Sequence, residues 1–201
     1  MPAAEGPGIE RSIGLTDAVV AIAMTLLILP LVEVSGEVDV GRLGEFLFDH
    51  RDLLLSFVVS FLVIYVFWAA HGAALRRLGG REVEVAALRP LSMCWLLVIA
   101  FLPFPTAVVG RELTATSAPL YIGSMFVLSA LTSAIVTVVA RATEPSPRVR
   151  WAWLTTLVFG LCALVSMANP DVGISLLLLL VVLRFLELRF LKGREPSGAR
   201  T

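Results

Sequence analysis

Hydrophobic residues in this chain gather into long runs that are separated by short polar connections. A run of roughly 20 predominantly apolar residues is long enough to cross the hydrocarbon core of a bilayer as a helix. The pattern therefore predicts an all-α membrane protein with six transmembrane helices in one chain. We expect these spans at about 14–34, 53–75, 88–109, 119–140, 151–168 and 173–192.

The polar remainder of the sequence predicts how the chain is divided. Residues 1–10 are expected to form an N-terminal tail, 11–193 the six-span domain and 194–201 a C-terminal tail. The N-terminus lacks the signal-peptide order of a basic segment, a short apolar segment and a cleavage site, and its first apolar run is long enough to span, so we expect this run to be retained as a span. The connections hold turn formers such as Ser35-Gly36 and Asn169-Pro170, and none is long enough for a further soluble domain.

The distribution of basic residues predicts the orientation. Of the 16 arginines and lysines, 13 lie in the N-terminal segment, the second and fourth connections and the C-terminal end. The first, third and fifth connections contain only Arg42, Arg51 and Arg111. Because positive residues stay on the cytoplasmic side, both termini are predicted to be cytoplasmic, in a multi-pass protein of the cell membrane. An even number of spans independently places both termini on one side.

Composition excludes several classes of function. The chain is 58% hydrophobic and 16% charged, whereas a soluble domain is about half apolar and a quarter charged. Sixteen basic and sixteen acidic residues give no net charge, and no basic aromatic patch suggests a nucleic-acid partner. No metal-ligand spacing or nucleophile motif accompanies the histidines, so neither an enzyme nor a cofactor is expected.

Polar residues inside the first span are the strongest sign of function. They are costly in a membrane helix unless they contact protein or water. At 100° per residue, Ile22, Thr25, Leu26 and Leu29 share one face, which presents a single hydroxyl among bulky apolar side chains. Two interpretations fit this face: the lining of a pore, or ordinary packing in which the threonine bonds to a carbonyl of its own helix.

The stretch RSIGLTDAVVAIAMTLLILPL, from Arg11 to Leu31, resembles the signature of the lysosomal-type potassium channels, the transmembrane protein 175 family, in its short bacterial form. In that family an arginine is followed four residues on by Phe-Ser-Asp, and here Leu15-Thr16-Asp17 takes that place. The string FLPFPTAVVGRE also resembles the family's third span.

This resemblance implies a homotetramer that conducts K⁺ through a central pore lined by the first helix. It makes Ile22 the constriction, Leu26 and Leu29 further apolar rings, and Thr25 the selectivity residue where K⁺ binds transiently. A ring of isoleucines gates ions by excluding water. The sequence contains no TVGYG loop, so we expect modest selectivity.

The resemblance also implies a structural network of Arg11, Thr16, Asp17, Trp68 and His71 at the cytoplasmic end. Asp17 lies about 130° around the helix from the Ile22–Leu29 face, so it should point into the bundle. We expect the Trp68 N–H and a His71 ring nitrogen to donate to Asp17. The alternatives are a helix cap at Thr16-Asp17, an interfacial aromatic residue at Trp68 and a solvated His71.

Pro103 and Pro105 remove two backbone donors and should break or kink the outer half of the third span, or end it at Pro103.

Two other functions remain open at this point. A small proton-coupled or cation transporter would use Asp17 and His71, although the paired broken helices of transporters are missing from the sequence. A non-conducting membrane scaffold or a subunit of an integral-membrane enzyme is the other.

Overall fold

The computed structural model describes the backbone of residues 7–38, 40–78, 85–143 and 148–192, and the side chains of 14–36, 38, 41–78, 88–143 and 149–181. Regular structure in these residues is entirely helical, as the apolar runs predict. The first half contains α1 (Pro7–Leu26), α2 (Leu29–Val34), two short 3-10 turns (Ser35–Glu37 and Val40–Arg42), α3 (Leu43–Asp49), α4 (Arg51–Arg76), α5 (Val85–Phe101) and α6 (Pro103–Arg111). The second half contains α7 (Ser117–Ala142), α8 (Arg148–Ala168) and α9 (Pro170–Lys192).

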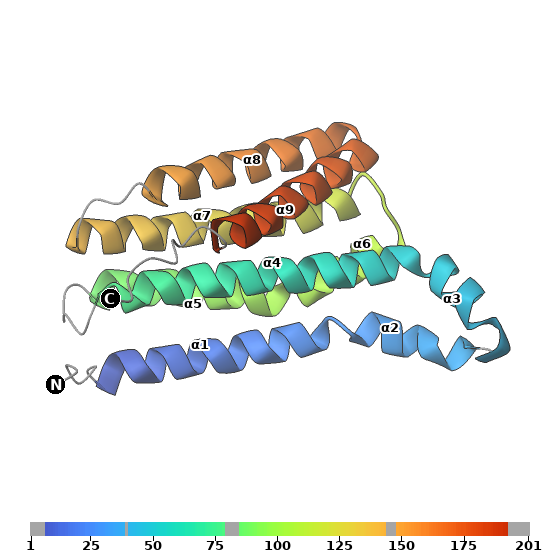
Figure 1. Ribbon diagram of the computed structural model, residues 1–201, viewed down its shortest axis with the longest axis horizontal. Helices are drawn as coiled ribbons and strands as arrows, with labels where there is room; N and C mark the ends of the chain where they lie inside the picture. The colour runs from blue at the N-terminus through green and yellow to red at the C-terminus, as the bar shows by residue number, and fades with distance from the viewer. Residues whose placement is uncertain (1–6, 39, 79–84, 144–147, 193–201) are drawn as a thin grey trace, which may run out of the picture.

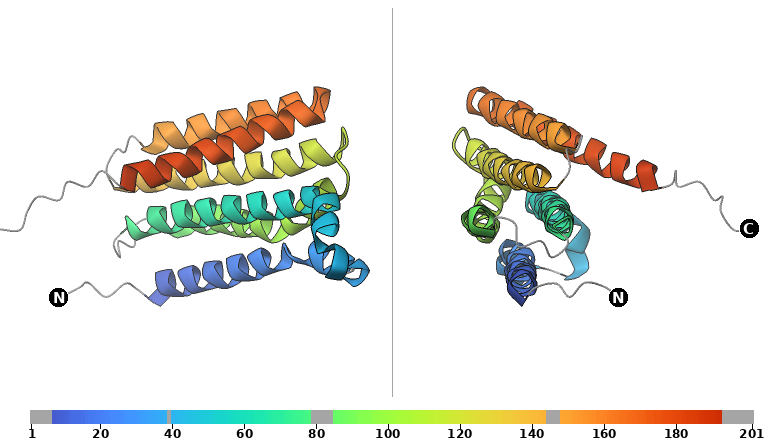
Figure 2. Two further views of the ribbon diagram at one scale, coloured as in Figure 1. Left: turned by 45° about the vertical axis from the view of Figure 1, so that its right-hand side comes forward. Right: turned by 90° about the vertical axis from the view of Figure 1, so that its left-hand side faces the viewer.

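The helices run side by side along the long axis of the molecule (Figure 1). Helix α7 lies at the centre and contacts α4, α5, α6, α8 and α9. Helix α1 lies at one edge, where it packs on α4 and α5, while α8 and α9 form the opposite edge. Figure 2 shows α9 leaving the bundle, so that its C-terminal half extends beyond the other helices.

Length and composition mark the membrane-crossing helices. Among the described residues, five stretches are long and apolar enough to cross a bilayer: Gly14–Val34, Arg51–Arg76, Leu88–Arg111, Ser117–Ala142 and Val149–Ala168. The Pro170–Val181 part of α9 is a shorter apolar helix. The sixth span predicted at 173–192 extends past Val181, into residues whose side chains lie outside the described part of the chain.

Two proline-linked interruptions shape the bundle. The first span, predicted as one helix, is broken: α1 ends at Leu26 and α2 begins at Leu29. Pro30 lies in the first turn of α2 and has no N–H to donate to Leu26, which removes one helical hydrogen bond. The third span is interrupted at Leu102 and resumes at Pro103, so it does not end at the prolines.

The core is apolar, with a few polar groups bonded between helices. Trp95, Tyr121 and Met125 are among its largest buried side chains. The Trp95 indole N–H donates to Thr132 Oγ1 at 2.9 Å, and Tyr121 and Thr106 hydroxyls lie 2.7 and 2.8 Å from Ser60 Oγ. No buried side-chain nitrogen or oxygen of the described residues lacks a partner. This satisfies the requirement that polar groups at membrane depth bond internally.

Candidate functional site on the first membrane helix

The face of α1 predicted to line a pore is not covered by its own chain. Ile22 and Leu26 are 59% and 39% exposed, whereas Val20 and Ala23 on the other side of the helix are almost fully buried. Thr25 is also exposed. Packing against neighbouring helices of the same chain therefore does not explain this face, which is open to lipid, to water or to another copy.

The helix break separates Leu29 from the other three residues. The sequence placed Ile22, Thr25, Leu26 and Leu29 on one continuous helical face, and this was wrong for Leu29, which begins α2. The cause is Pro30, since the chain turns at Leu27 and Ile28 before it resumes as a helix. Leu29 is still 49% exposed, so it adjoins the face without sharing its helix.

The Thr25 hydroxyl is bonded within its own helix. Its Oγ1 donates to the Ile22 carbonyl oxygen at 2.7 Å. A hydroxyl has one proton to give and two lone pairs with which to accept. Because the proton is already engaged, the exposed side of the oxygen presents acceptor capacity, which suits a cation better than an anion.

The N-terminal half of α1 is joined to α4 by a polar contact. Trp68 Nε1 donates to Asp17 Oδ1 at 2.8 Å. Thr16, beside it, is buried and also takes part in an interaction. The side chain of Arg11 lies outside the described residues. The predicted donation from Trp68 to Asp17 is thus present in the structure.

His71 has a different partner from the one predicted. It is 1% exposed, its ring stacks on Trp95 with 4.4 Å between centroids, and its Nε2 lies 3.5 Å from Ser92 Oγ. The hydrogen bonds found among the described residues join His71 to α5 through Ser92, and not to Asp17. Helix α4 therefore connects to α1 through Trp68 and to α5 through His71.

A second contact of the first span was missed by sequence reasoning. Arg111, the last residue of α6, forms an ion pair with Glu33 of α2. Both side chains are about 60% exposed. The available signal was one acidic and one basic residue at the C-terminal ends of the first and third spans. Together with Trp68 and Asp17, this pair attaches the α1–α2 segment to the bundle near both ends.

The described residues contain no group of three or more histidine, cysteine or acidic residues placed to hold a metal ion. The exposed face formed by Ile22, Thr25 and Leu26 presents one hydroxyl together with apolar side chains.

Comparisons with known proteins identify relatives of about half of the chain. Residues 11–103 match the family model described as "Endosomal/lysosomal potassium channel TMEM175". A human protein named "Endosomal/lysosomal proton channel TMEM175" is 32% identical over 104 residues, which are 49% of this chain and 20% of that protein. A Streptomyces collinus protein named as a potassium channel is 35% identical over 98 residues, 49% of this chain and 46% of that one. The chain thus matches less than half the length of either relative.

The fold also matches a solved structure. The crystal structure of a lysosomal potassium-selective channel TMEM175 homolog from Chamaesiphon minutus aligns with a TM-score of 0.75. The alignment covers 90% of this chain and 97% of that one at 21% identity. At this identity the match establishes a shared fold and leaves the activity to be argued from the residues.

Proposed function

Because residues 11–103 belong to the TMEM175 family, we propose that this chain is a subunit of a potassium-permeable channel of the cell membrane, with α1 lining the pore. The observation that carries the proposal is the uncovered face formed by Ile22, Thr25 and Leu26 on a helix whose other side is buried. The function needs no enzymatic step and no cofactor, only the permeant K⁺.

The proposed pore requires several copies of the chain. One α1 helix at the edge of its own bundle encloses no path, so identical faces must meet on a symmetry axis in a closed oligomer. A homotetramer follows from the family resemblance. In this arrangement each chain contributes six spans, within residues 11–193, and both termini are cytoplasmic.

Apolar side chains form the proposed gate. A ring of Ile22 side chains, followed outward by Leu26 and Leu29, makes a narrow passage that ions cannot enter while it is dry. Opening must widen or rotate the ring until water enters. The break between α1 and α2 supports such motion, because a missing backbone hydrogen bond lets two helical segments tilt separately.

Thr25 is the proposed selectivity residue. Its Oγ1 gives its proton to Ile22 and keeps acceptor capacity on the exposed side, so a ring of these oxygens can replace part of the hydration shell of K⁺. Potassium sheds water more easily than sodium, which favours K⁺ at a ring of weak ligands. Binding there is transient, as conduction requires.

The structural network is proposed to hold α1 in place while the pore face stays free. Trp68 of α4 donates to Asp17 of α1, and His71 of α4 contacts α5 through Ser92. Arg11 and Thr16 are assigned to this network by the resemblance. Their role is positioning and not conduction, because they precede the pore face along α1.

Replacement of Ile22 by asparagine tests the gate. A polar ring should stay hydrated, so K⁺ flux into liposomes that contain purified Ile22→Asn protein should rise above the wild-type level. Leu164→Asn is the control, because Leu164 is 67% exposed on α8, far from α1. Equal flux in wild type and Ile22→Asn would refute the pore assignment, provided that the control is also unchanged.

Proton movement is the second candidate function. It is favoured by the human relative, which is named a proton channel, and by the titratable side chains Asp17 and His71 on the contacting helices α1 and α4. In this case transport depends on the pH gradient and is lost in Asp17→Asn. Reversal potentials in planar bilayers, measured with K⁺, Na⁺ and pH gradients in turn, separate a potassium channel from a proton-coupled path.

A further inference from the structure

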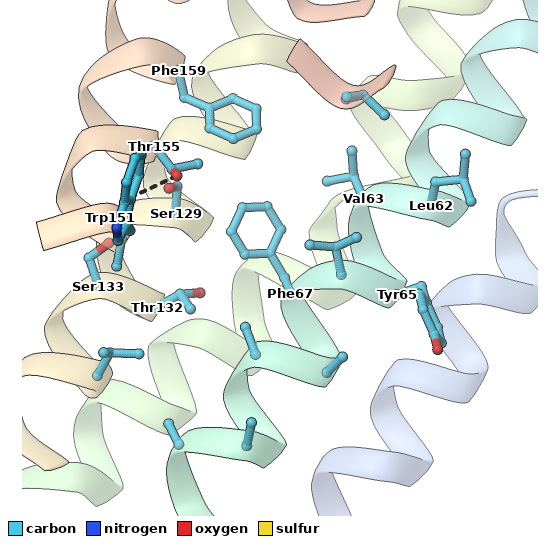
Figure 3. A pocket seen from close by; sticks show the side chains of 18 of the residues that line it. Leu62, Val63, Tyr65, Phe67, Ser129, Thr132, Ser133, Trp151, Thr155 and Phe159 are labelled. Atoms are coloured by element: carbon cyan, nitrogen blue, oxygen red, sulfur yellow. Dashed lines mark hydrogen bonds between the residues drawn. The ribbon is translucent and has the colours of Figure 1, made fainter. Parts of the chain in front are cut away.

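A cavity of about 500 Å³ lies between α4, α7, α8 and α9 (Figure 3). Its volume is within the roughly 300–1,000 Å³ that is usual for ligand pockets. Helix α1 contributes none of its lining residues in the described part of the chain, so the cavity is separate from the proposed pore.

Small side chains and a diverging helix create this space. Ala69, Ala70, Ala73 and Ala74 of α4 line the cavity and leave room that larger residues would fill. Helix α9 leaves the bundle (Figure 2), and in the described part of the chain only its residues Leu180 and Val181 line the cavity. Phe67 of α4 and Phe159 of α8 point toward one another, with 6.0 Å between ring centroids (Figure 3).

The lining is effectively apolar, even though several hydroxyls belong to it. Ser129 and Ser133 each lie 2.9 Å from Thr156 Oγ1. Thr132 accepts from Trp95 and donates to the Leu128 carbonyl. Since these groups are bonded to protein, an occupant gains little by offering them hydrogen bonds. A hydrocarbon chain fits such a surface better than a polar ligand does.

The inner end of the cavity is positively charged. Arg77, just after α4, is itself a lining residue. Arg76, Arg141 and Arg150 lie at the neighbouring ends of α4, α7 and α8. Within the described residues, these three helix ends carry no aspartate or glutamate. Basic pockets between helices on the cytoplasmic side attract the headgroups of anionic lipids.

We propose that this cavity binds one acyl chain of an anionic phospholipid, with the phosphate of its headgroup on Arg77. The apolar walls hold the chain and the basic end holds the head, which matches the two parts of this ligand. The second acyl chain stays in the bilayer, because the cavity is open on one side. A second copy of the protein fits less well, since its own basic helix ends would repel those of the first.

Lipid retention tests the proposal directly. Purified protein is incubated with equal amounts of dioleoyl-phosphatidylglycerol and dioleoyl-phosphatidylcholine, and bound lipid is counted by native mass spectrometry. We expect about one tightly held phosphatidylglycerol per chain in the wild type. Arg77→Gln should lower the preference for phosphatidylglycerol about fivefold, which corresponds to roughly 1 kcal/mol for one basic residue near a lipid surface.

Filling the cavity is the second arm. Ala73→Trp should remove the retained lipid, while Leu164→Trp on the outer face of α8 and Arg51→Gln at the opposite end of α4 should leave it bound. Equal retention of the two lipids by the wild type would overturn the proposal. So would an Ala73→Trp protein that keeps its lipid but loses its oligomeric mass, because this face would then be a contact between subunits.

Discussion

At the scale of single residues, Thr25 is bonded within its own helix and still keeps acceptor capacity on its hydroxyl oxygen. Its proton is used by the Ile22 carbonyl, so the remaining interaction with an ion involves only lone pairs. A hydrogen bond to a carbonyl of the same helix was the alternative explanation for a threonine in this membrane helix. This bond is compatible with the proposed role of Thr25 in selectivity.

Thr25→Val keeps the shape of the side chain and removes the oxygen. One oxygen ligand contributes about 0.5–1.5 kcal/mol, so the ratio of K⁺ to Na⁺ permeability should fall roughly two- to tenfold. Bi-ionic reversal potentials in planar bilayers measure this ratio. Thr25→Ser keeps the hydroxyl and should stay near the wild-type value. A valine variant with unchanged selectivity would remove Thr25 from the ion path.

The contact between Trp68 and Asp17 joins a neutral donor to a carboxylate. Trp68→Phe removes the N–H and keeps most of the ring, and it should lower the free energy of unfolding by about 1 kcal/mol, since the exposed side of the pair is screened. Trp153→Phe is the matched control, because Trp153 Nε1 donates to the neutral Thr137 hydroxyl at 3.1 Å. Thermal unfolding in detergent should show the larger loss for Trp68→Phe; equal losses would deny the carboxylate a special role.

The depth of Trp68, His71 and Asp17 along their helices could be predicted from the sequence. The side chains that His71 contacts could not. Counting along helices places Trp68, His71 and Asp17 at one depth, and Trp68 does contact Asp17. His71 is three positions further on, about 60° around the helix, and this rotation turns it toward Trp95 and Ser92. Rotation and tilt depend on the packing of all the helices, which a single helical pattern does not contain.

At the scale of elements, proline explains where helices stop, and glycine explains where they approach. The break before Pro30 was not predicted, because the apolar run continues through it without interruption. Hydropathy reports whether a segment suits lipid, and it is insensitive to one missing backbone donor. The short helix α3 was missed for the related reason that its residues lie in a connection outside the apolar runs.

Gly173 allows the first turn of α9 to approach the end of α8. A Cβ atom built there would lie 2.7 Å from the Ser166 Cα, a backbone atom that cannot move alone. Gly173→Ala should therefore destabilise the fold by about 1–3 kcal/mol, as overpacking does. Gly123→Ala in α7 is the control, since no atom lies within 4 Å of its Cβ position. Unfolding temperatures should fall for the first variant only; a fall in both would point to a general intolerance of alanine.

At the scale of the whole molecule, the bundle has a fixed part and an edge segment attached by few polar contacts. Helix α7 contacts most of the other helices, whereas α1 and α2 lie at one edge. The all-helical, membrane-crossing class could be predicted because long apolar runs dictate membrane-crossing helices. The attachment of the edge could not, because Glu33 and Arg111 are far apart in sequence and are brought together by the packing of α2 and α6 on α4.

Widening of the proposed Ile22 ring requires the α1–α2 segment to move against this bundle, and the ion pair between Glu33 and Arg111 opposes that motion. Both side chains are about 60% exposed, and such pairs contribute about 0.2–1 kcal/mol. A contact of this size biases an equilibrium without locking it. Arg111→Gln should raise K⁺ flux in liposomes by up to about fivefold, with little change in unfolding temperature.

The chain supplies a matched control in the pair between Arg42 and Glu45, which is similarly exposed but lies within one short segment. Arg42→Gln removes a comparable interaction without releasing α2 from α6, so it should leave the flux at the wild-type level. High salt should raise wild-type flux toward that of Arg111→Gln, since exposed pairs are screened. If both variants raise flux equally, surface charge and not attachment of the pore segment controls conduction.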